Sequence, residues 1–368
     1  MKKINRHGIV AAKISYNSYK ENLEYFCIEA LEDGLQAKLS DNACEYRIDD
    51  GSWNNLSADS NTPSINKGQT LSFKGNNLKP SIVVGIGTFT ISKKCNLKGN
   101  IMSLLYGDDF VDKNDLSGKK YAFSKLFSHC SNIVDASKLV LPATTLASYC
   151  YSDMFYFCIR LTEAPALPAT TLAYGCYEYM FDNCYSLTSA LELPATTLAE
   201  KCYDRMFSDT NVLPDCSNID FSSETVVRSG GLNGLFAGTK VTDADLELIL
   251  PKNSNSEYCL PVETLASYCY KDMFSNCTNL TTAPELPATT LVTECYAYMF
   301  YGCSKLNNIT MLATNISASN CLKNWVYNVS STGTFVKNAN MTSLPTGESG
   351  IPNGWTVIDY ETPSGSND

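Results

Sequence analysis

One phrase returns five times in this chain with few changes. It reads LPATTLASYCYSDMF from Leu141 and LPATTLAYGCYEYMF from Leu167, and further copies begin at Leu193, Leu260 and Leu286. The first three copies start 26 residues apart, and so do the last two. A repeat of this length cannot bury its apolar face alone, so neighbouring repeats must stack and share a core.

A Met-Phe pair closes each copy and extends the register to degenerate repeats. Leu126 and Phe127 precede the first clear copy, Leu235 and Phe236 lie in the irregular middle, and Trp325 follows the last copy. About eight repeats are therefore expected, more than the three or so that a stacked array needs.

The apolar positions within a repeat predict two kinds of backbone. Leu146, Cys150 and Met154 are spaced i, i+4 and i+8, which predicts a short helix. The stretch from Leu161 to Leu167 is short and contains a proline, which predicts a brief strand or extended segment. We therefore predict a repeat solenoid with one short strand and one short helix in each 26-residue repeat.

The turn that closes the repeat carries the pattern Met-Phe-x-x-Cys-x-x-Leu, for example from Met180, Met273 and Met299. With the Leu-Pro step and the repeat spacing, residues 116–325 resemble the BspA-like leucine-rich repeats of bacterial surface proteins. The family's usual repeat is slightly shorter and has Ile-Pro and Ala-Phe-x-x-Cys-x-x-Leu. The resemblance implies a curved leucine-rich-repeat solenoid and a role in adhesion or partner binding, and it implies no catalytic residue.

Different composition marks the two ends of the chain. Residues 1–98 hold short β-prone runs between turn signals, which predicts an N-terminal all-β sandwich that caps the repeats. Its phrase from Tyr46 to Trp53 also resembles β-sandwich modules that precede such repeats in gut-bacterial proteins.

The repeat region is expected to span residues 99–325, with an irregular part at 211–259. Residues 326–360 are expected to form a C-terminal cap with a hairpin. Residues 361–368 have no apolar content and are expected to be disordered.

Most of the sixteen cysteines occupy two positions of the repeat. Stacking gives equivalent cysteines parallel Cβ vectors, which suit disulfide geometry poorly, so they are predicted to be buried free thiols. No pair has the short spacing of a zinc site, so we expect no metal and no cofactor.

Catalytic and nucleic-acid-binding functions find little support in the sequence. It contains no phosphate-binding glycine loop, zinc-protease helix or serine-nucleophile elbow, and its two histidines, His7 and His129, have no recurring nucleophile beside them. We therefore predict that the chain is not an enzyme. The net charge of −10 without a basic cluster argues against binding to nucleic acid or to anionic membranes.

The 22 tyrosines supply the candidate binding surface. Those that follow the first repeat cysteine recur in register and are assigned to packing. Tyrosines outside that position are the candidates for recognition, because tyrosine is enriched at protein interfaces. The candidates are Tyr149, Tyr156, Tyr174, Tyr179 and Tyr298.

These observations predict a non-enzymatic binding or adhesion protein that recognises a protein partner, such as a host-matrix or bacterial surface protein. A structural or receptor-binding component of a phage virion and a carbohydrate-binding surface module are the alternatives. The family resemblance implies a cell-surface location. However, the first twelve residues have too short an apolar run for a secretory signal, and no stretch is long enough to span a membrane. Either a leader has been removed, or the chain reaches a virion after cytoplasmic synthesis, which fits free thiols.

Overall fold

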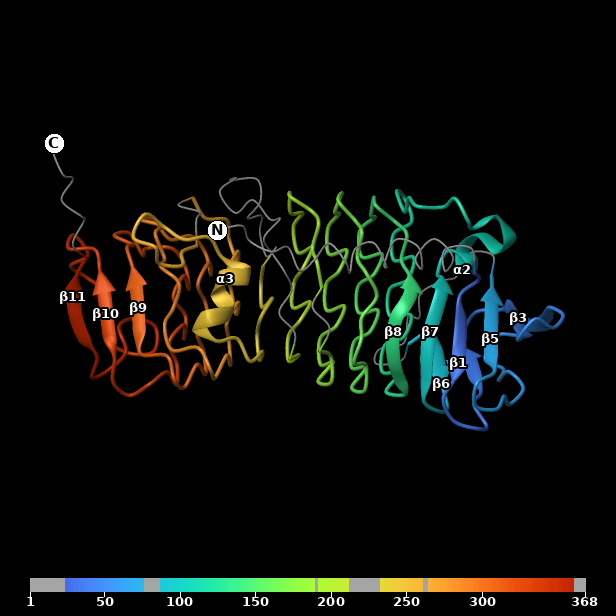
Figure 1. Ribbon diagram of the computed structural model, residues 1–368. Helices are drawn as coiled ribbons and strands as arrows, with labels where there is room; N and C mark the ends of the chain where they lie inside the picture. Colours follow the sequence, from blue (N-terminus) through green and yellow to red (C-terminus); the bar gives the residue numbers. More distant parts are fainter. Residues whose placement is uncertain (1–23, 76–86, 189–190, 212–231, 261–263, 361–368) are drawn as a thin grey trace, which may run out of the picture. The chain divides into compact units, whose positions relative to one another are not determined.

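The computed structural model describes residues 24–75, 87–188, 191–211, 232–260 and 264–360 (Figure 1). Contacts within the chain define two compact units. Unit 1 comprises Met1–Thr171 and Asn183–Leu191, and unit 2 comprises Leu172–Asp182 and Glu192–Asp368.

Unit 1 contains most of the strands. A six-stranded sheet has the order β4-β3-β5-β1-β7-β8, and a two-stranded sheet pairs β2 with β6. The strands are β1 (Cys27–Ala30), β2 (Ala37–Leu39), β3 (Cys44–Ile48), β4 (Asn54–Leu56), β5 (Thr70–Lys74), β6 (Phe89–Ile91), β7 (Cys95–Asn100) and β8 (Ile133–Val140). A short helix, α2 (Ser103–Tyr106), and a 3-10 turn, η1 (Gly107–Asp109), follow β7.

The large sheet is mixed, because β8 pairs with β7 in parallel whereas the other neighbours are antiparallel. β8 comes from the repeat region, so the N-terminal strands and the first repeats share one sheet (Figure 1). Their core is also continuous: the ring of Phe26 lies 5.5 Å from Phe89 and 5.6 Å from Phe127, centroid to centroid. A mixed sheet shared with the first repeats thus replaces the predicted N-terminal all-β sandwich.

Unit 2 ends in a three-stranded parallel sheet with the order β11-β10-β9 (Figure 1). The strands are β9 (Asn308–Met311), β10 (Thr334–Lys337) and β11 (Thr356–Asp359), and a 3-10 turn η2 (Asp243–Asp245) leads into helix α3 (Leu246–Ile249). The predicted C-terminal hairpin is wrong, since a hairpin requires antiparallel neighbours. The predicted disordered tail lies outside the described residues.

Amides in the repeats alternate between two kinds of hydrogen bond. Every second residue donates to the carbonyl three residues back, as Leu126 N does to Phe123 O at 3.2 Å. The residues between them donate to the next repeat, as Phe127 N does to Met154 O at 2.9 Å. The same alternation recurs in unit 2. An α-helix would instead bond each amide four residues back.

The backbone of the repeats turns left-handed at every fourth residue. In one repeat these residues are Tyr121, Lys125 and His129, with φ of 60°, 58° and 62°. An α-helix excludes such residues, because each costs roughly 1–2 kcal/mol when it carries a Cβ. The spacing of four therefore comes from successive turns.

The prediction of a leucine-rich-repeat solenoid with a short helix in every repeat is thus wrong. Helix in the described residues is limited to α2 and α3, of four residues each. The error lies in the period, since a four-residue turn pattern and a 3.6-residue helix place the same three apolar side chains on one face.

Burial of the cysteines confirms that they pack as free thiols. All fifteen described cysteines are buried and none forms a disulfide. Thiols at the second repeat position donate to a backbone carbonyl of the preceding repeat, as Cys158 Sγ does to Phe127 O at 3.1 Å and Cys303 Sγ does to Phe274 O at 3.0 Å. Burial raises the pKa of Cys130 and of Cys277 to about 12.

Replacing a repeat residue with glycine distinguishes turns from a helix, because the change in the free energy of unfolding has opposite signs in the two structures. We expect Lys125→Gly to raise the free energy of unfolding by about 1 kcal/mol, because it removes a Cβ from a left-handed residue. In a helix the same change would lower it by about 1 kcal/mol. The matched control is Lys323→Gly, since Lys323 lies in a repeat but has a negative φ; it should lose about 0.5–1 kcal/mol. Urea unfolding followed by circular dichroism measures both, and a loss at Lys125 would contradict the turn structure.

Thiol labelling tests the buried cysteines. The described cysteines should not react with a thiol reagent at pH 8 in the folded protein, because the nucleophilic thiolate is rare when the pKa is high and the reagent has no access. They should react fully in guanidinium chloride. Mass spectrometry of labelled peptides identifies the modified residues, and rapid native labelling of Cys158 or Cys303 would show that the thiol ladder is exposed.

Candidate functional site

The five predicted tyrosines are all half-buried, and the two units divide them. Tyr149 and Tyr156 belong to unit 1, and Tyr174, Tyr179 and Tyr298 belong to unit 2. The tyrosines assigned to packing are at most 2% exposed, which confirms that assignment. They are Tyr151, Tyr177, Tyr203, Tyr270 and Tyr296.

Aromatic side chains form two groups on unit 1, each with exposed and half-buried members. The rings of Tyr121 and Tyr149 stack with centroids 5.0 Å apart and planes inclined by 4°. The second group, the Phe157 cluster, consists of His129, Tyr156, Phe157 and Tyr185. Phe157 lies at its centre, with its centroid 5.4 Å from His129, 5.9 Å from Tyr156 and 6.1 Å from Tyr185.

Unit 2 carries a longer group, the Tyr298 row, made of Tyr268, Lys271, Tyr298, Tyr301, Lys323 and Tyr327. Lys271 Nζ lies 5.6 Å from the ring centre of Tyr268 and 5.9 Å from that of Tyr298. Lys323 Nζ lies 5.7 Å from the same Tyr298 ring. Tyr301 and Tyr327 stack with centroids 4.8 Å apart. Aromatic and cationic side chains from successive repeats thus lie next to one another.

Several of these exposed side chains were missed by sequence reasoning. Tyr121, Tyr185, Tyr268 and Tyr327 are 38–49% exposed, more than any of the predicted tyrosines. Tyr121 and Tyr268 occupy left-handed positions of their repeats. Position in the repeat was a usable signal for two of them, because Tyr268 directly precedes the repeat cysteine Cys269 and Tyr185 directly follows Cys184.

The other two predicted tyrosines in unit 2 have charged neighbours. Lys201 Nζ lies 5.9 Å from the ring centre of Tyr174. Burial, followed by the charge of Asp204, raises the pKa of Tyr179 to about 12. Tyr179 is therefore a poor candidate for an accessible recognition group.

Two buried carboxyl groups, Asp204 and Asp272, and the half-buried Arg205 form a charged group near Tyr179. Arg205 Nη2 lies 3.2 Å from Asp272 Oδ2. Asp204 is only 3% exposed, and burial raises its carboxyl pKa from 3.8 to about 6. Burial also raises the pKa of Asp272. Such a shift favours the uncharged carboxyl in the folded protein.

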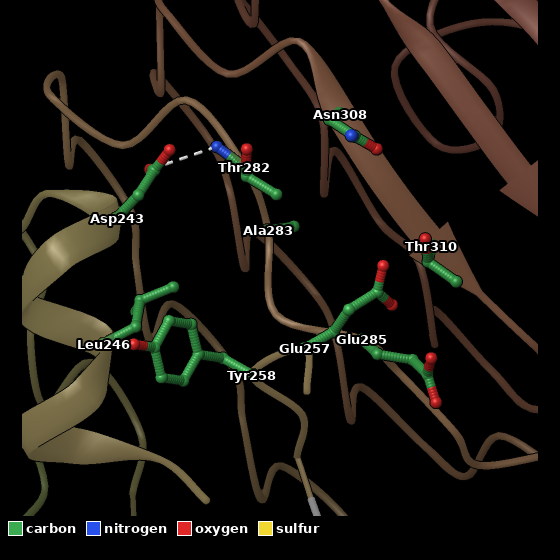
Figure 2. A pocket seen from close by; sticks show the side chains of 9 residues that line it. All are labelled: Asp243, Leu246, Glu257, Tyr258, Thr282, Ala283, Glu285, Asn308 and Thr310. Carbon is green, nitrogen blue, oxygen red and sulfur yellow. Dashed lines mark hydrogen bonds between the residues drawn. The ribbon is translucent and has the colours of Figure 1, made fainter. Parts of the chain in front are cut away.

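A pocket of about 240 Å³ opens beside α3 in unit 2 (Figure 2). At one end Asp243 accepts hydrogen bonds from the backbone amides of Thr281 and Thr282, at 2.8 and 3.1 Å. The side chains of Glu257 and Glu285 lie next to each other at the other end. The lining residues are Asp243, Leu246, Glu257, Tyr258, Thr282, Ala283, Glu285, Asn308 and Thr310.

Glu285 is held in place on the wall of this pocket. Its Oε2 accepts a hydrogen bond from Asn253 Nδ2 at 2.9 Å, and its side chain is largely buried. Burial, followed by the charge of Glu257, raises the pKa of Glu285. The lining offers carboxylates, hydroxyls and an amide without a cationic side chain, so its chemistry suits a cationic or hydroxyl-rich group.

Within the described ranges, no three His, Cys, Asp or Glu side chains lie close enough together to hold a metal ion. None of the helices in those ranges has the length and apolar character needed to cross a bilayer.

Comparison with protein-family models, curated proteins and solved structures gives no match. The resemblance to the BspA-like family therefore stays a prediction.

The raised pKa of Asp204 predicts a pH dependence of stability. The folded state binds this proton more tightly than the unfolded state, so the free energy of unfolding should fall as the pH rises from about 4 through 6. A shift of about two pKa units corresponds to about 3 kcal/mol at most. Asp204→Asn should reduce that fall by the part that Asp204 contributes and stabilise the protein at pH 7, as measured by urea unfolding from pH 4 to 7; the raised pKa of Asp272 leaves a smaller fall. The control is Asp209→Asn, an exposed carboxylate of the same repeat, and an unchanged profile in Asp204→Asn would refute the assignment.

Proposed function

We propose that this chain is a non-enzymatic binding protein that recognises a protein partner through the exposed side chains of its repeats. The Tyr298 row is the observation that carries this proposal. Lysine ammonium groups lie against the rings of Tyr268 and Tyr298, and the rings of Tyr301 and Tyr327 continue the row. Tyr268 and Tyr327 are each more than one third exposed.

Rigidity of the repeats favours such recognition. Tyr268 and Tyr298 stand on left-handed residues, and their amides bond to the next repeat at 3.1 and 2.9 Å. Side chains anchored in this way lose little further freedom on binding, which lowers the entropic cost of association. Tyrosine adds a large apolar area and a hydroxyl on a side chain with few rotatable bonds.

The charges of the two lysines in the Tyr298 row indicate which chemical groups a partner surface should carry. Lys271 Nζ is paired with Glu294 at 2.8 Å, whereas the side chain of Lys323 is exposed beside Tyr298. A partner surface that combines apolar groups with carboxylates or carbonyl oxygens would complement this row. We propose a host-matrix or bacterial surface protein as the partner, and a location outside the cell.

Two other functions use the same features. A carbohydrate-binding module would stack sugar rings on aromatic side chains, such as the exposed ring of Tyr121, which lies parallel to the half-buried Tyr149. A structural or receptor-binding component of a virion would use the repeats as a spacer, and buried free thiols suit synthesis in a reducing cytoplasm.

A binding screen with a surface variant tests the proposal. The probes are immobilised fibronectin, collagen and laminin, intact bacterial cells, and a glycan array. Saturable binding to a protein or cell probe should weaken at least tenfold in the double variant Tyr268→Ser/Tyr327→Ser, since aromatic anchors commonly contribute more than 1 kcal/mol each. Tyr185→Ser, an exposed tyrosine of unit 1, is the control and should bind as the unmodified protein does.

Each other outcome of the screen counts against the proposal. Saturable binding to glycans alone would replace it with the carbohydrate-binding alternative. Absence of binding to every probe, or equal binding by the double variant and the unmodified chain, would reject the Tyr298 row as the recognition surface.

A further inference from the structure

Strand β11 forms an open edge of the parallel sheet in unit 2 (Figure 1). Thr356 N donates to Gly333 O at 2.9 Å, and Tyr360 N donates to Lys337 O at 2.7 Å. In a parallel strand, successive residues direct their backbone groups to opposite sides. Val357 and Asp359 therefore direct their N–H and C=O groups away from β10, toward a side where no described strand pairs.

The buried core also ends at this strand. Ile309 on β9 and Phe335 on β10 are fully buried, and Val357 is their neighbour in the register of β11. Val357 is nevertheless 41% exposed, and Ile358 is 48% exposed. These two are the only aliphatic side chains among the exposed large hydrophobic residues of the described ranges. An additional strand beside β11 would continue the column that Val357 ends.

The sequence of β11 protects this edge only weakly. Natural edge strands avoid pairing through short length, charged side chains, proline or a bulge, and β11 reads Thr-Val-Ile-Asp, with its one charge at the end of the strand. Residues 361–368 are a poor covering strand, because they contain Pro363 and no large apolar residue.

We propose that β11 pairs antiparallel with β11 of a second copy of this chain, across a two-fold axis. Only residues with outward backbone groups can exchange hydrogen bonds there. One register uses the outward N–H and C=O groups of both Val357 and Asp359. It places Val357 opposite Asp359 of the second copy and Asp359 opposite Val357 of the second copy, and each of these two pairs forms two hydrogen bonds. Ile358 then faces Ile358 of the second copy, and β-branched pairs of this kind stabilise neighbouring strands.

Registers shifted by two residues also place outward-facing residues opposite one another, but they are less favourable. One places Asp359 opposite Asp359 of the second copy, and like charges directly opposite destabilise a sheet. The other places Val357 opposite itself and needs the amide of Trp355, which already donates to Pro352 O at 3.3 Å. In the proposed register Asp359 keeps its ion pair with Lys337, at 2.6 Å.

This association goes beyond the proposed function, since it requires no ligand. A strand of four residues buries far less area than a standard interface, so the dimer should be weak, with a dissociation constant on the order of 10–500 µM. A concentration series of the full chain by sedimentation velocity should show the mass rising from 40.4 kDa toward twice that value.

Two variants test the strand and its register. Ile358→Lys should abolish the rise in mass without changing the circular dichroism spectrum, because Ile358 is exposed. Ile358→Cys should form an intermolecular disulfide under mild oxidation. Thr356→Cys is the matched control, since the proposed register separates it from its equivalent by roughly 13 Å. The native cysteines of this sheet region are buried and should not interfere.

Three results would overturn the proposal. In the first, the chain stays monomeric up to about 500 µM, the upper end of the dissociation constants expected for so small an interface, and the two cysteine variants crosslink equally. Another is association that survives Ile358→Lys. The third is association only after removal of residues 361–368, which would mean that the tail covers β11 in the full chain.

Discussion

The repeats depend on how their amide groups are divided between two sets of acceptors. One set of amides bonds three residues back, and the other bonds to the neighbouring repeat. A buried amide without a partner is costly, so a single repeat with half of its amides unpaired is unstable. The same bonds fix the register in which the phenylalanines stack, such as Phe274 on Phe300 at 5.9 Å, and in which thiols reach backbone carbonyls. The hydrogen bonds that attach one repeat to the next therefore also determine how the core packs.

The two sets of amide hydrogen bonds also explain why exposed side chains of the repeats form rows. Left-handed residues recur at every fourth position, and several carry large side chains such as Tyr298 and Phe157. Hydrogen bonds of the neighbouring backbone offset the strain of these left-handed residues. Equivalent positions of successive repeats then lie side by side, so aromatic and charged side chains gather in rows. Recognition is a property of such rows more than of any single cavity, although the pocket lined by Glu257 and Glu285 offers a separate acidic recess.

Particular residues show where sequence reasoning succeeded and where it failed. Burial of Tyr151 and Cys158 follows from their recurrence, because a position repeated in register must pack against its own copies. Helix was the wrong assignment for Leu146, Cys150 and Met154, since a spacing of four fits both a helix and this series of turns. The error extended to the surface: Tyr268 was overlooked and the half-buried Tyr179 was chosen.

By itself the sequence determined the length of the repeat, the need for stacking and the two ladders of buried cysteine, because recurrence in register records packing directly. Only the tertiary structure decided the backbone of the repeat, since the choice between a helix and turns depends on whether amides bond within a repeat or to the next one. It likewise decided the parallel pairing of β10 with β11 and the exposure of Val357. These features depend on which segment lies alongside, and a list of residues does not carry that information.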